Sequence, residues 1–174
     1  MAEFCDIYDI NRNKTGRLHK RGQPDMNEGD CLLIVIVWIM NNKNEFLISK
    51  RAAGIWRSGT WQTTSGCAIA GDDSLSAALR ETKEELGITL NPKSGKLLKQ
   101  YNEGTNLFDI WFFHQDVDIS EIVLQPSETY DAVWASRENI NRMIDENIFL
   151  SGEPPNFEAN MSDVSCLPCS VEKS

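Results

Sequence analysis

The residues best suited to chemistry lie in one short segment, from position 66 to 88. It begins with a glycine loop and continues into a helix-forming stretch that contains Glu81, Glu84 and Glu85. Side chains at positions i, i+3 and i+4 project from nearly the same side of an α-helix, so this spacing gathers three negative charges. Hard divalent cations such as Mg²⁺ prefer oxygen ligands of this kind. The pattern therefore favours a metal site for phosphate chemistry, and the alternative is a solvated acidic helix face.

The helix that would position these carboxylates is expected to run from Ser74 to Leu86. Asp73 or Ser74 is suited to the N-cap, and Gly87 lies where a glycine commonly ends a helix. Apolar or small residues recur on one narrow stripe, and the glutamates occupy a different sector. The stripe consists of Leu75, Ala78, Leu79, Thr82 and Leu86. One face of the helix should therefore pack while another presents the acids.

The remaining elements predict an α/β fold in which a mixed sheet lies between helices. A nearly all-apolar strand buried on both faces is expected at 32–39, and a returning hairpin strand at 45–50. An edge strand is expected at 4–10, a polar turn-like segment at 11–22 and an irregular loop at 52–64. Further strands are expected at 96–101, 107–115 and 129–135, with a second helix at 137–146. Strands, helix, strands and helix in this order favour a mixed sheet flanked by helices.

Length and composition favour one domain over residues 1–150, followed by a loosely packed tail at 151–174 that is rich in Gly, Pro, Asn and Ser. The net charge of -9 argues against binding to nucleic acid or an anionic membrane. The longest apolar run, 31–40, is too short to cross a bilayer, and no signal peptide is visible. Five cysteines in an uneven distribution do not resemble a disulfide framework. A cytoplasmic protein is therefore expected.

The segment 66–88 closely resembles the box of the Nudix family, G-x5-E-x7-R-E-U-x-E-E-x-G-U, in which U is a bulky aliphatic residue. Seven of its nine fixed positions match: Gly66, Arg80, Glu81, Glu84, Glu85, Gly87 and Ile88. Asp72 stands where the pattern has Glu, so the contact made by the longer side chain must be shifted or lost. Thr82 replaces an aliphatic residue, but it falls in the packing stripe and is therefore a change in packing rather than in chemistry.

The resemblance implies an α/β/α sandwich that hydrolyses a diphosphate linkage, in a nucleoside diphosphate joined to another group. Mg²⁺ or Mn²⁺ would be held by Glu81, Glu84, Glu85 and the backbone carbonyl of Gly66, and Arg80 would orient the glutamates. Bound divalent ions lower the pKa of the attacking water and neutralise the diphosphate. The partner would be a small phosphorylated substrate, and analogy with the family alone points to a homodimer.

Outside the box, the chain contains Asp6-x-x-Asp9 followed by Thr15-Gly16, then Val37-Trp38-Ile39, then Ser49-Lys50-Arg51 followed by Trp61. These segments more weakly resemble the entry to the box in the branch of this superfamily that contains isopentenyl diphosphate isomerase. The isomerase reaction resembles a metal-assisted proton transfer that uses a cysteine and several histidines. Ser65 occupies the cysteine position here, and Cys67 and Leu32 occupy two histidine positions. With two histidines in the whole chain that metal cage cannot be built, so an isomerase is disfavoured. The rival from another class is a catalytically inactive Nudix domain that binds a nucleotide as a sensor.

Several residues outside the box are further candidates. Lys50 and Arg51 would grip substrate phosphate, and the alternative for both is a solvated strand end. Trp56 and Trp61 would stack a base, although aromatic residues beside a glycine loop more often close a core. The remaining candidates are acids: Glu128 or Asp131 as the general base that accepts the proton of water, and more weakly Asp109.

The thiols and imidazoles give weaker signals. Cys67 lies inside the glycine loop, where a small packed side chain is expected rather than a reactive thiol. Cys166 and Cys169 form a single C-x-x-C pair, and no second pair is present to complete a zinc site. His19 and His114 are isolated in the sequence and are expected to be structural or exposed.

Overall fold

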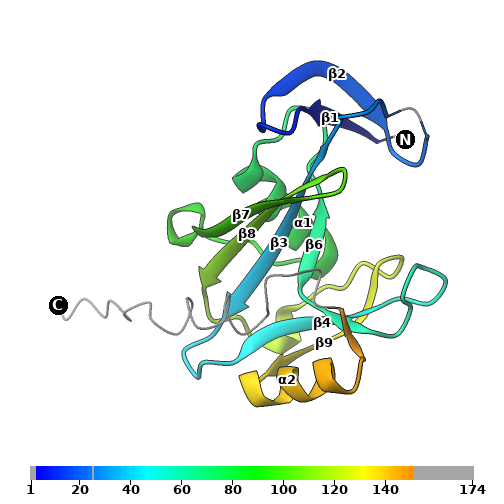
Figure 1. Cartoon of the computed structure of the whole chain (residues 1–174). Coiled ribbons are helices and arrows are strands. Elements are labelled where there is room, and N and C mark those ends of the chain that lie inside the picture. The colour runs from blue at the N-terminus through cyan, green and yellow to red at the C-terminus, as the bar shows by residue number, and fades with distance from the viewer. Residues whose placement is uncertain (1–2, 25, 151–174) are drawn as a thin grey trace.

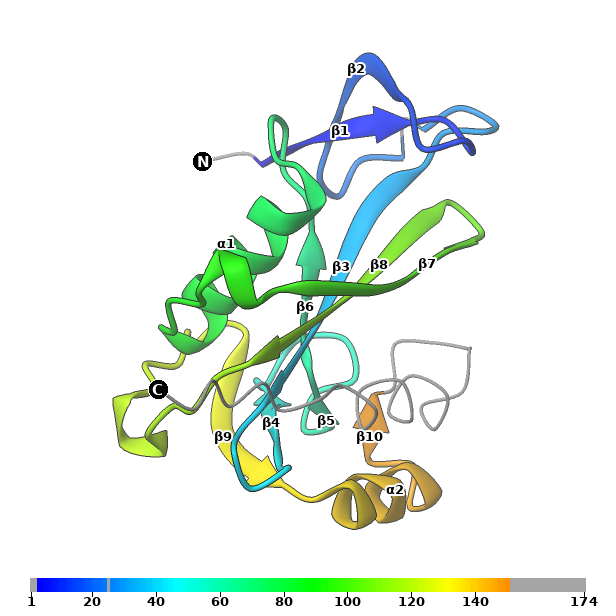
Figure 2. The same ribbon diagram turned by 90° about the vertical axis from the view of Figure 1, so that its left-hand side faces the viewer.

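Strand β3 (Leu32–Met40) forms the middle of the protein, because its nine residues are nearly all apolar and are buried on both faces. The computed structural model describes residues 3–24 and 26–150. One face of β3 contributes Leu33, Val35 and Val37 to one hydrophobic core, and the other contributes Ile36 and Trp38 to a second. The expected strand buried on both faces is thereby confirmed, and it separates the two cores. Figures 1 and 2 show β3 running through the middle of the strands.

The main sheet has eight strands of mixed direction. Strand β3 is parallel to β8 (Asn106–His114) and antiparallel to β6 (Thr64–Cys67). It meets β4 (Phe46–Arg51) only at the pair Met40–Phe46. The two strands of the expected hairpin therefore diverge directly after the turn, and β4 pairs with β5 and β9 instead. The remaining strands are β5 (Trp61–Gln62), β7 (Lys96–Glu103), β9 (Thr129–Ala135) and β10 (Phe149–Leu150).

One helix covers each face of this sheet, which gives the expected α/β/α sandwich. Helix α1 (Ser74–Leu86) packs on the first core, and α2 (Arg137–Asp145) packs on the second through Ile140. Figure 2 shows the two helices on different sides of the strands. Two short 3-10 helices, Pro92–Ser94 and Ile119–Glu121, lie in the connecting loops.

The N-terminal region differs from the sequence expectation. Residues 11–22 were expected to be a polar turn, but Lys14–Lys20 form strand β2, which pairs with β1 (Phe4–Tyr8) in a separate two-stranded sheet. Six of the seven residues in β2 are exposed, so the strand has no apolar alternation that would reveal it. Strand β1 is not an edge of the main sheet. It lies beside the loop before α1, where the backbone N–H of Ala70 donates to the carbonyl of Phe4 (2.7 Å; Figure 1).

Two other expectations concern the loop before the box and the end of the chain. The loop expected at 52–64 contains β5, and its last residue begins β6. The tail at 151–174, with its C-x-x-C pair, lies outside the described residues. Within residues 3–24 and 26–150, no helix is both long and apolar enough to cross a membrane.

Candidate active site

Helix α1 begins and ends where the sequence indicated. Asp73 is its N-cap, and its carboxylate accepts a hydrogen bond from the N–H of Ser76 (2.7 Å). Gly87 adopts a left-handed conformation (φ 72°), and its N–H donates to the carbonyl of Lys83. The unusual Thr82 is fully buried in the packing stripe, where its hydroxyl donates to the carbonyl of Ala78 (2.9 Å). The change from an aliphatic residue is therefore accommodated by packing.

Two of the three glutamates are buried rather than solvated. Glu81 is 9% exposed and Glu85 is 4% exposed, whereas half of the Glu84 side chain is open to solvent. Ionised carboxylates are rarely buried without partners, because their desolvation is costly. The alternative interpretation, a solvated acidic face, therefore does not apply to Glu81 and Glu85.

The burial of Glu81 depends on a close approach between α1 and β6 at Gly66. A Cβ atom placed on Gly66 would lie 2.0 Å from the carboxyl carbon of Glu81, well inside van der Waals contact. Gly66 pairs with Val35 on β3, so the strand cannot simply move away from the helix. Any side chain at position 66 must therefore displace the carboxylate.

Burial also changes the ionisation of both acids. Desolvation, reinforced by the nearby charges of Glu81 and Glu128, raises the pKa of Glu85 to about 8. Desolvation likewise raises the pKa of Glu81, although the positive charge of Arg80 opposes this shift. Burial therefore makes ionisation of both carboxyl groups less favourable than in water, and more so for Glu85 than for Glu81, which pairs with Arg80.

Arg80 connects the acids to the loop before the helix. Its guanidinium donates to Glu81 (2.9 Å), to Glu84 (2.9 Å) and to the backbone carbonyl of Cys67 (3.0 Å). It also pairs with Asp72 through Nε (3.0 Å). The shorter carboxylate at position 72 therefore still reaches the arginine of the box.

The donor set fits a hard divalent cation in chemistry, although its members do not yet converge. Within the part of the chain that the structure describes, no three His, Cys, Asp or Glu side chains are already gathered around one point. Glu81 and Glu84 instead accept hydrogen bonds from Arg80. However, Oε2 of Glu85 is buried without a hydrogen-bond partner among the described residues. A buried acceptor oxygen beside further carboxylates is a suitable ligand for Mg²⁺.

The two basic residues at the end of β4 point to opposite faces of the sheet. Leu47 belongs to the core beneath α1 and Ile48 to the core beneath α2, so strand alternation places Arg51 with the first and Lys50 with the second. Arg51 is close enough to lower the pKa of Glu85, and it donates to Gln62 (2.6 Å). The structure therefore brings Arg51, but not Lys50, to the glutamates.

Lys50 and the candidate tryptophans form a different arrangement. The ammonium of Lys50 lies over the rings of Trp61 (5.3 Å) and Tyr130 (5.5 Å). Trp61 packs against the core beneath α2, whereas Trp56 is 71% exposed and contacts Arg57. The structure places neither tryptophan on the acidic helix, and a role of Trp61 in substrate binding stays a prediction.

The three acids proposed as a general base lie in different parts of the structure. Glu128 directly precedes β9, and its charge contributes to the raised pKa of Glu85. Asp131 pairs with Lys50 in the sheet register, which directs it to the α2 face. Asp109 is 1% exposed and forms an ion pair with Arg12 (2.6 Å), so its role is structural. Of the three, only Glu128 interacts electrostatically with the glutamates of α1.

Arg21 is a residue that sequence reasoning missed. It directly follows β2 and pairs with Glu3 (2.7 Å), and 57% of its side chain is exposed. Its positive charge lowers the pKa of Glu81, and Glu128 is one of the charges that raise the pKa of Arg21 itself. The N-terminal hairpin therefore brings a solvent-accessible cation to the acidic cluster. Because the proximity of Arg21 to the acidic residues depends on how the hairpin folds, no local sequence pattern predicts it.

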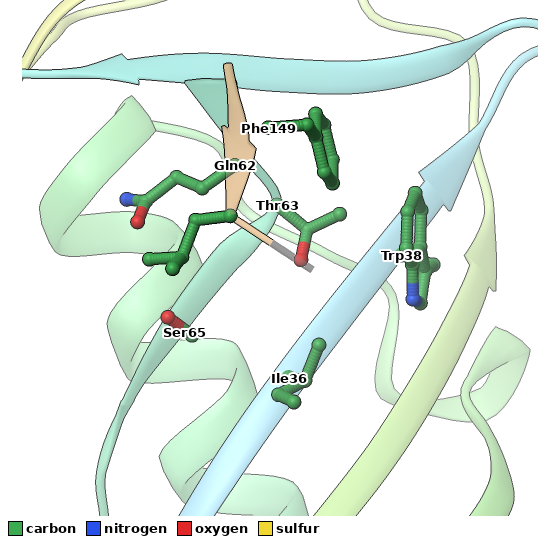
Figure 3. Close-up of a pocket in the computed structure, with 7 residues that line it drawn as sticks. Ile36, Trp38, Gln62, Thr63, Ser65 and Phe149 are labelled. Atoms are coloured by element: carbon green, nitrogen blue, oxygen red, sulfur yellow. The ribbon is translucent and has the colours of Figure 1, made fainter. Parts of the chain in front are cut away.

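A small recess lies on the other face of β6. It is bounded by Ile36 and Trp38 on β3, by Phe149 on β10, and by the polar residues Gln62, Thr63 and Ser65 (Figure 3). Ser65 lines the recess, while the adjacent Gly66 faces Glu81. One short strand thus separates an apolar recess from the acidic cluster.

Comparison with known proteins identifies the family. The family model of the NUDIX domain matches residues 32–150, which is more than half of the chain. The chain belongs to the Nudix family. An uncharacterized Nudix hydrolase of Listeria monocytogenes is 31% identical over 150 residues, covering 85% of this chain and 88% of the relative. A second uncharacterized Nudix hydrolase, from Listeria innocua, matches equally well.

Solved structures support the Nudix fold at lower identity. The protein DR0079 of Deinococcus radiodurans has a TM-score of 0.70 at 16% identity, covering 95% of this chain and all of that one. A bifunctional NMN adenylyltransferase/ADP ribose pyrophosphatase of Francisella tularensis, crystallised with AMP and a manganese ion, has a TM-score of 0.57 at 19% identity. That match covers 77% of this Nudix chain and 40% of the other. At these identities the likeness establishes the fold alone.

The burial of Glu85 leads to a testable expectation for the metal-free protein. When metal is removed with a chelator, Glu85→Gln should raise the thermal unfolding midpoint above about pH 5, because it removes a group that ionises more easily in the unfolded chain than in its buried place in the fold. The pKa of Glu85 is about 8 in the folded state, against 4.5 for an unperturbed glutamate. As pH rises between these two values the unfolded state releases its proton first, so the wild type loses stability while the variant does not.

The difference in unfolding midpoint between Glu85→Gln and the wild type should therefore widen between about pH 5 and pH 8 and then level off. Each kcal/mol corresponds to roughly 2–4 °C in the midpoint for a chain of this size. Glu103→Gln, at the exposed end of β7, is the matched control and should show no such trend. A difference that stays constant across this pH range would contradict the burial argument.

Proposed function

We propose that this protein is a metal-dependent pyrophosphohydrolase that cleaves a diphosphate linkage, in a nucleoside diphosphate joined to another group. The observation that carries the proposal is the burial of two carboxylates. Glu81 lies against Gly66, and Glu85 is buried with one oxygen left without a partner among the described residues. A helix that only served the fold would have little reason to bury two carboxylates in this way.

The charges around the site support a cation and an anionic substrate together. Six carboxylates and three guanidinium groups interact there, which leaves an excess of three negative charges when all are ionised. The acids are Glu3, Asp72, Glu81, Glu84, Glu85 and Glu128, and the cations are Arg21, Arg51 and Arg80. One divalent ion would offset most of that excess, and Arg21, which pairs with Glu3 but keeps 57% of its side chain exposed, would reach a phosphate group from solvent.

Each residue of the site has a proposed role. Glu81, Glu84, Glu85 and the carbonyl of Gly66 would hold Mg²⁺ or Mn²⁺, which when bound lowers the pKa of water and neutralises the diphosphate. Arg80 would position Glu81 and Glu84 until they turn to the ion. Arg21 and Arg51 would bind substrate phosphate, since guanidinium groups match its oxygens. Glu128 would accept the proton of the attacking water as the general base.

The isomerase interpretation has less support. The cysteine position is Ser65, whose side chain lines the recess on the opposite face of β6 from the glutamates. The two histidine positions hold Cys67 and Leu32. A nucleotide sensor would also use the fold, but binding alone does not require two buried carboxylates. Both alternatives become outcomes of the experiment that follows.

The deciding experiment incubates the purified protein with nucleoside diphosphate sugars, dinucleoside polyphosphates, dinucleotide cofactors, nucleoside triphosphates and prenyl diphosphates, with and without Mg²⁺. We expect Mg²⁺-dependent release of a phosphate monoester from one nucleotide class. Glu84→Gln or Glu85→Gln should lower kcat by about 10²–10⁴, as expected when a group acting on the reacting water is lost. The exposed Glu103→Gln should be neutral. Tight nucleotide binding without turnover of any compound would instead establish the sensor, and double-bond migration in a prenyl diphosphate the isomerase.

The same assay tests Glu128 as the base. Glu128→Gln should lower kcat to a similar extent while leaving Mg²⁺ affinity unchanged, because Glu128 is not among the proposed ligands. A wild-type rate for this variant would assign the proton transfer to another group.

Gly66→Ala tests the close approach between β6 and α1. The added methyl group meets the far end of the flexible Glu81 side chain, so the fold should persist with little change in the unfolding midpoint. The displaced carboxylate should weaken Mn²⁺ binding at least about tenfold, a loss of about 1.4 kcal/mol. Binding is followed by electron paramagnetic resonance of the free ion. Unchanged Mn²⁺ affinity would exclude the Glu81 carboxylate, at its observed position, from the site.

Arg21→Gln tests the contribution of the hairpin to substrate binding. Loss of a charged hydrogen bond to phosphate should raise KM about tenfold or more, with kcat changed less than about threefold. Lys20→Gln removes the same charge from the adjacent exposed position and is the matched control. Equal effects of the two variants would indicate general electrostatic attraction rather than a specific contact.

A further inference from the structure

Two cysteines from distant parts of the chain meet beside the candidate site. Cys5 lies in β1 and Cys67 ends β6, and their sulfur atoms are 3.3 Å apart. Cys5 is 1% exposed, whereas Cys67 is only partly buried. Figures 1 and 2 show β1 crossing near the end of β6. This pair has no part in the proposed hydrolysis.

The backbone around both cysteines is held in place by several contacts. The N–H of Ala70 donates to the carbonyl of Phe4 (2.7 Å), and the N–H of Gly71 donates to the carboxylate of Asp6 (2.9 Å). Lys14 bridges Asp6 (2.7 Å) and the carbonyl of Asp72 (2.9 Å). These bonds join the hairpin to the loop on both sides of the thiols. A disulfide requires about 2.05 Å between sulfurs, so the atoms need to approach by only about 1.2 Å.

We propose that Cys5 and Cys67 form a reversible disulfide that locks the N-terminal hairpin onto the loop before α1, with a peroxide as the oxidant. Cys67, the more accessible of the two, reacts as its thiolate after giving its proton to solvent. Its sulfur attacks one oxygen of hydrogen peroxide and breaks the O–O bond, which leaves a sulfenic acid on Cys67, and the departing hydroxide takes up a proton and leaves as water. The sulfur of Cys5 then attacks the Cys67 sulfur and forms the S–S bond. The sulfenic hydroxyl leaves with the thiol proton of Cys5 as a second water. Two electrons pass from the two thiols to the peroxide, and a dithiol reductant reverses the reaction.

The cross-link would act on the parts of the molecule that surround the acidic cluster. Arg21 belongs to the same hairpin as Cys5, and the carbonyl of Cys67 accepts a hydrogen bond from Arg80 (3.0 Å). The disulfide would therefore fix the position of Arg21 relative to β6, whose Cys67 carbonyl accepts a hydrogen bond from Arg80. In a reducing compartment such a bond would form only while the oxidant is present, and it would not be a permanent structural cross-link.

The test is peptide mapping of the full chain. The protein is reduced, freed of reductant, treated with equimolar hydrogen peroxide, alkylated and digested with trypsin without further reduction. The sequence places the cysteines in separate tryptic peptides: Cys5 in 1–12, Cys31 in 22–43, Cys67 in 58–80 and the tail pair in 143–173. We expect peptides 1–12 and 58–80 to be joined, with a mass two hydrogens below their sum. The buried Cys31 should stay a free thiol, and the alkylating reagent should reach it only once the protein is unfolded.

Variants separate the two steps and the structural consequence. Cys5→Ser should leave a sulfenic acid on Cys67 that dimedone traps, and Cys67→Ser should leave Cys5 unmodified. Cys31→Ser is the matched control and should form the disulfide normally. Oxidation should raise the unfolding midpoint of the wild type and of Cys31→Ser by at least about 5 °C, because a long loop is closed. The unfolding midpoint of Cys5→Ser should not rise on oxidation, even if Cys166 and Cys169 are oxidised.

Either of two results would overturn the proposal. One is oxidation confined to peptide 143–173, or to sulfinic acid on Cys67, while Cys5 stays a free thiol. The other is a joined peptide with no rise in the unfolding midpoint above that of Cys5→Ser, which would mean that the hairpin is not locked. Neither result bears on whether the protein hydrolyses a diphosphate, so the two proposals can fail separately.

Discussion

The contact between Gly66 and Glu81 is the constraint on which the rest of the site depends. Because position 66 has no side chain, α1 lies so close to β6 that a carboxylate occupies the space of a Cβ atom. This depth buries Glu81 and, one turn later, Glu85, and desolvation then raises both pKa values. Under the proposed function, a bound cation would restore the stability that the fold loses in this way.

Arg80 explains how the fold tolerates these acids without a cation. It contacts Glu81, Glu84 and Asp72 and a carbonyl of the loop, and only a fifth of its side chain is exposed. A guanidinium can satisfy several acceptors at once because its donors form a rigid fork. Glu85 lies outside that reach, and one of its oxygens has no partner among the described residues. The arginine thus stabilises part of the acidic cluster and leaves one carboxylate available.

The parts that could be predicted from sequence are those determined by local pattern. The limits of α1, its caps and the buried strand β3 follow from periodicity, capping and composition. Strand β2 could not be recognised because all of its residues except His19 are exposed, so no apolar alternation marks it. The separation of Lys50 from Arg51 was accessible in principle, since adjacent residues of a strand point to opposite faces. Arg21 and the Cys5–Cys67 pair depend on tertiary placement of the hairpin, for which a single sequence carries no signal.

The N-terminal hairpin lies outside the residues that match the family model, yet it contacts the loop of the box at several points. A motif shared by a whole family supplies the common chemistry and cannot by itself distinguish one substrate from another. Discrimination must then come from groups that reach the site from elsewhere in the chain. The hairpin is one such source, because it brings a positive charge to the acids and is attached to the loop by hydrogen bonds and a thiol pair. Any change that shifts the hairpin therefore acts on the site without altering a residue of the box.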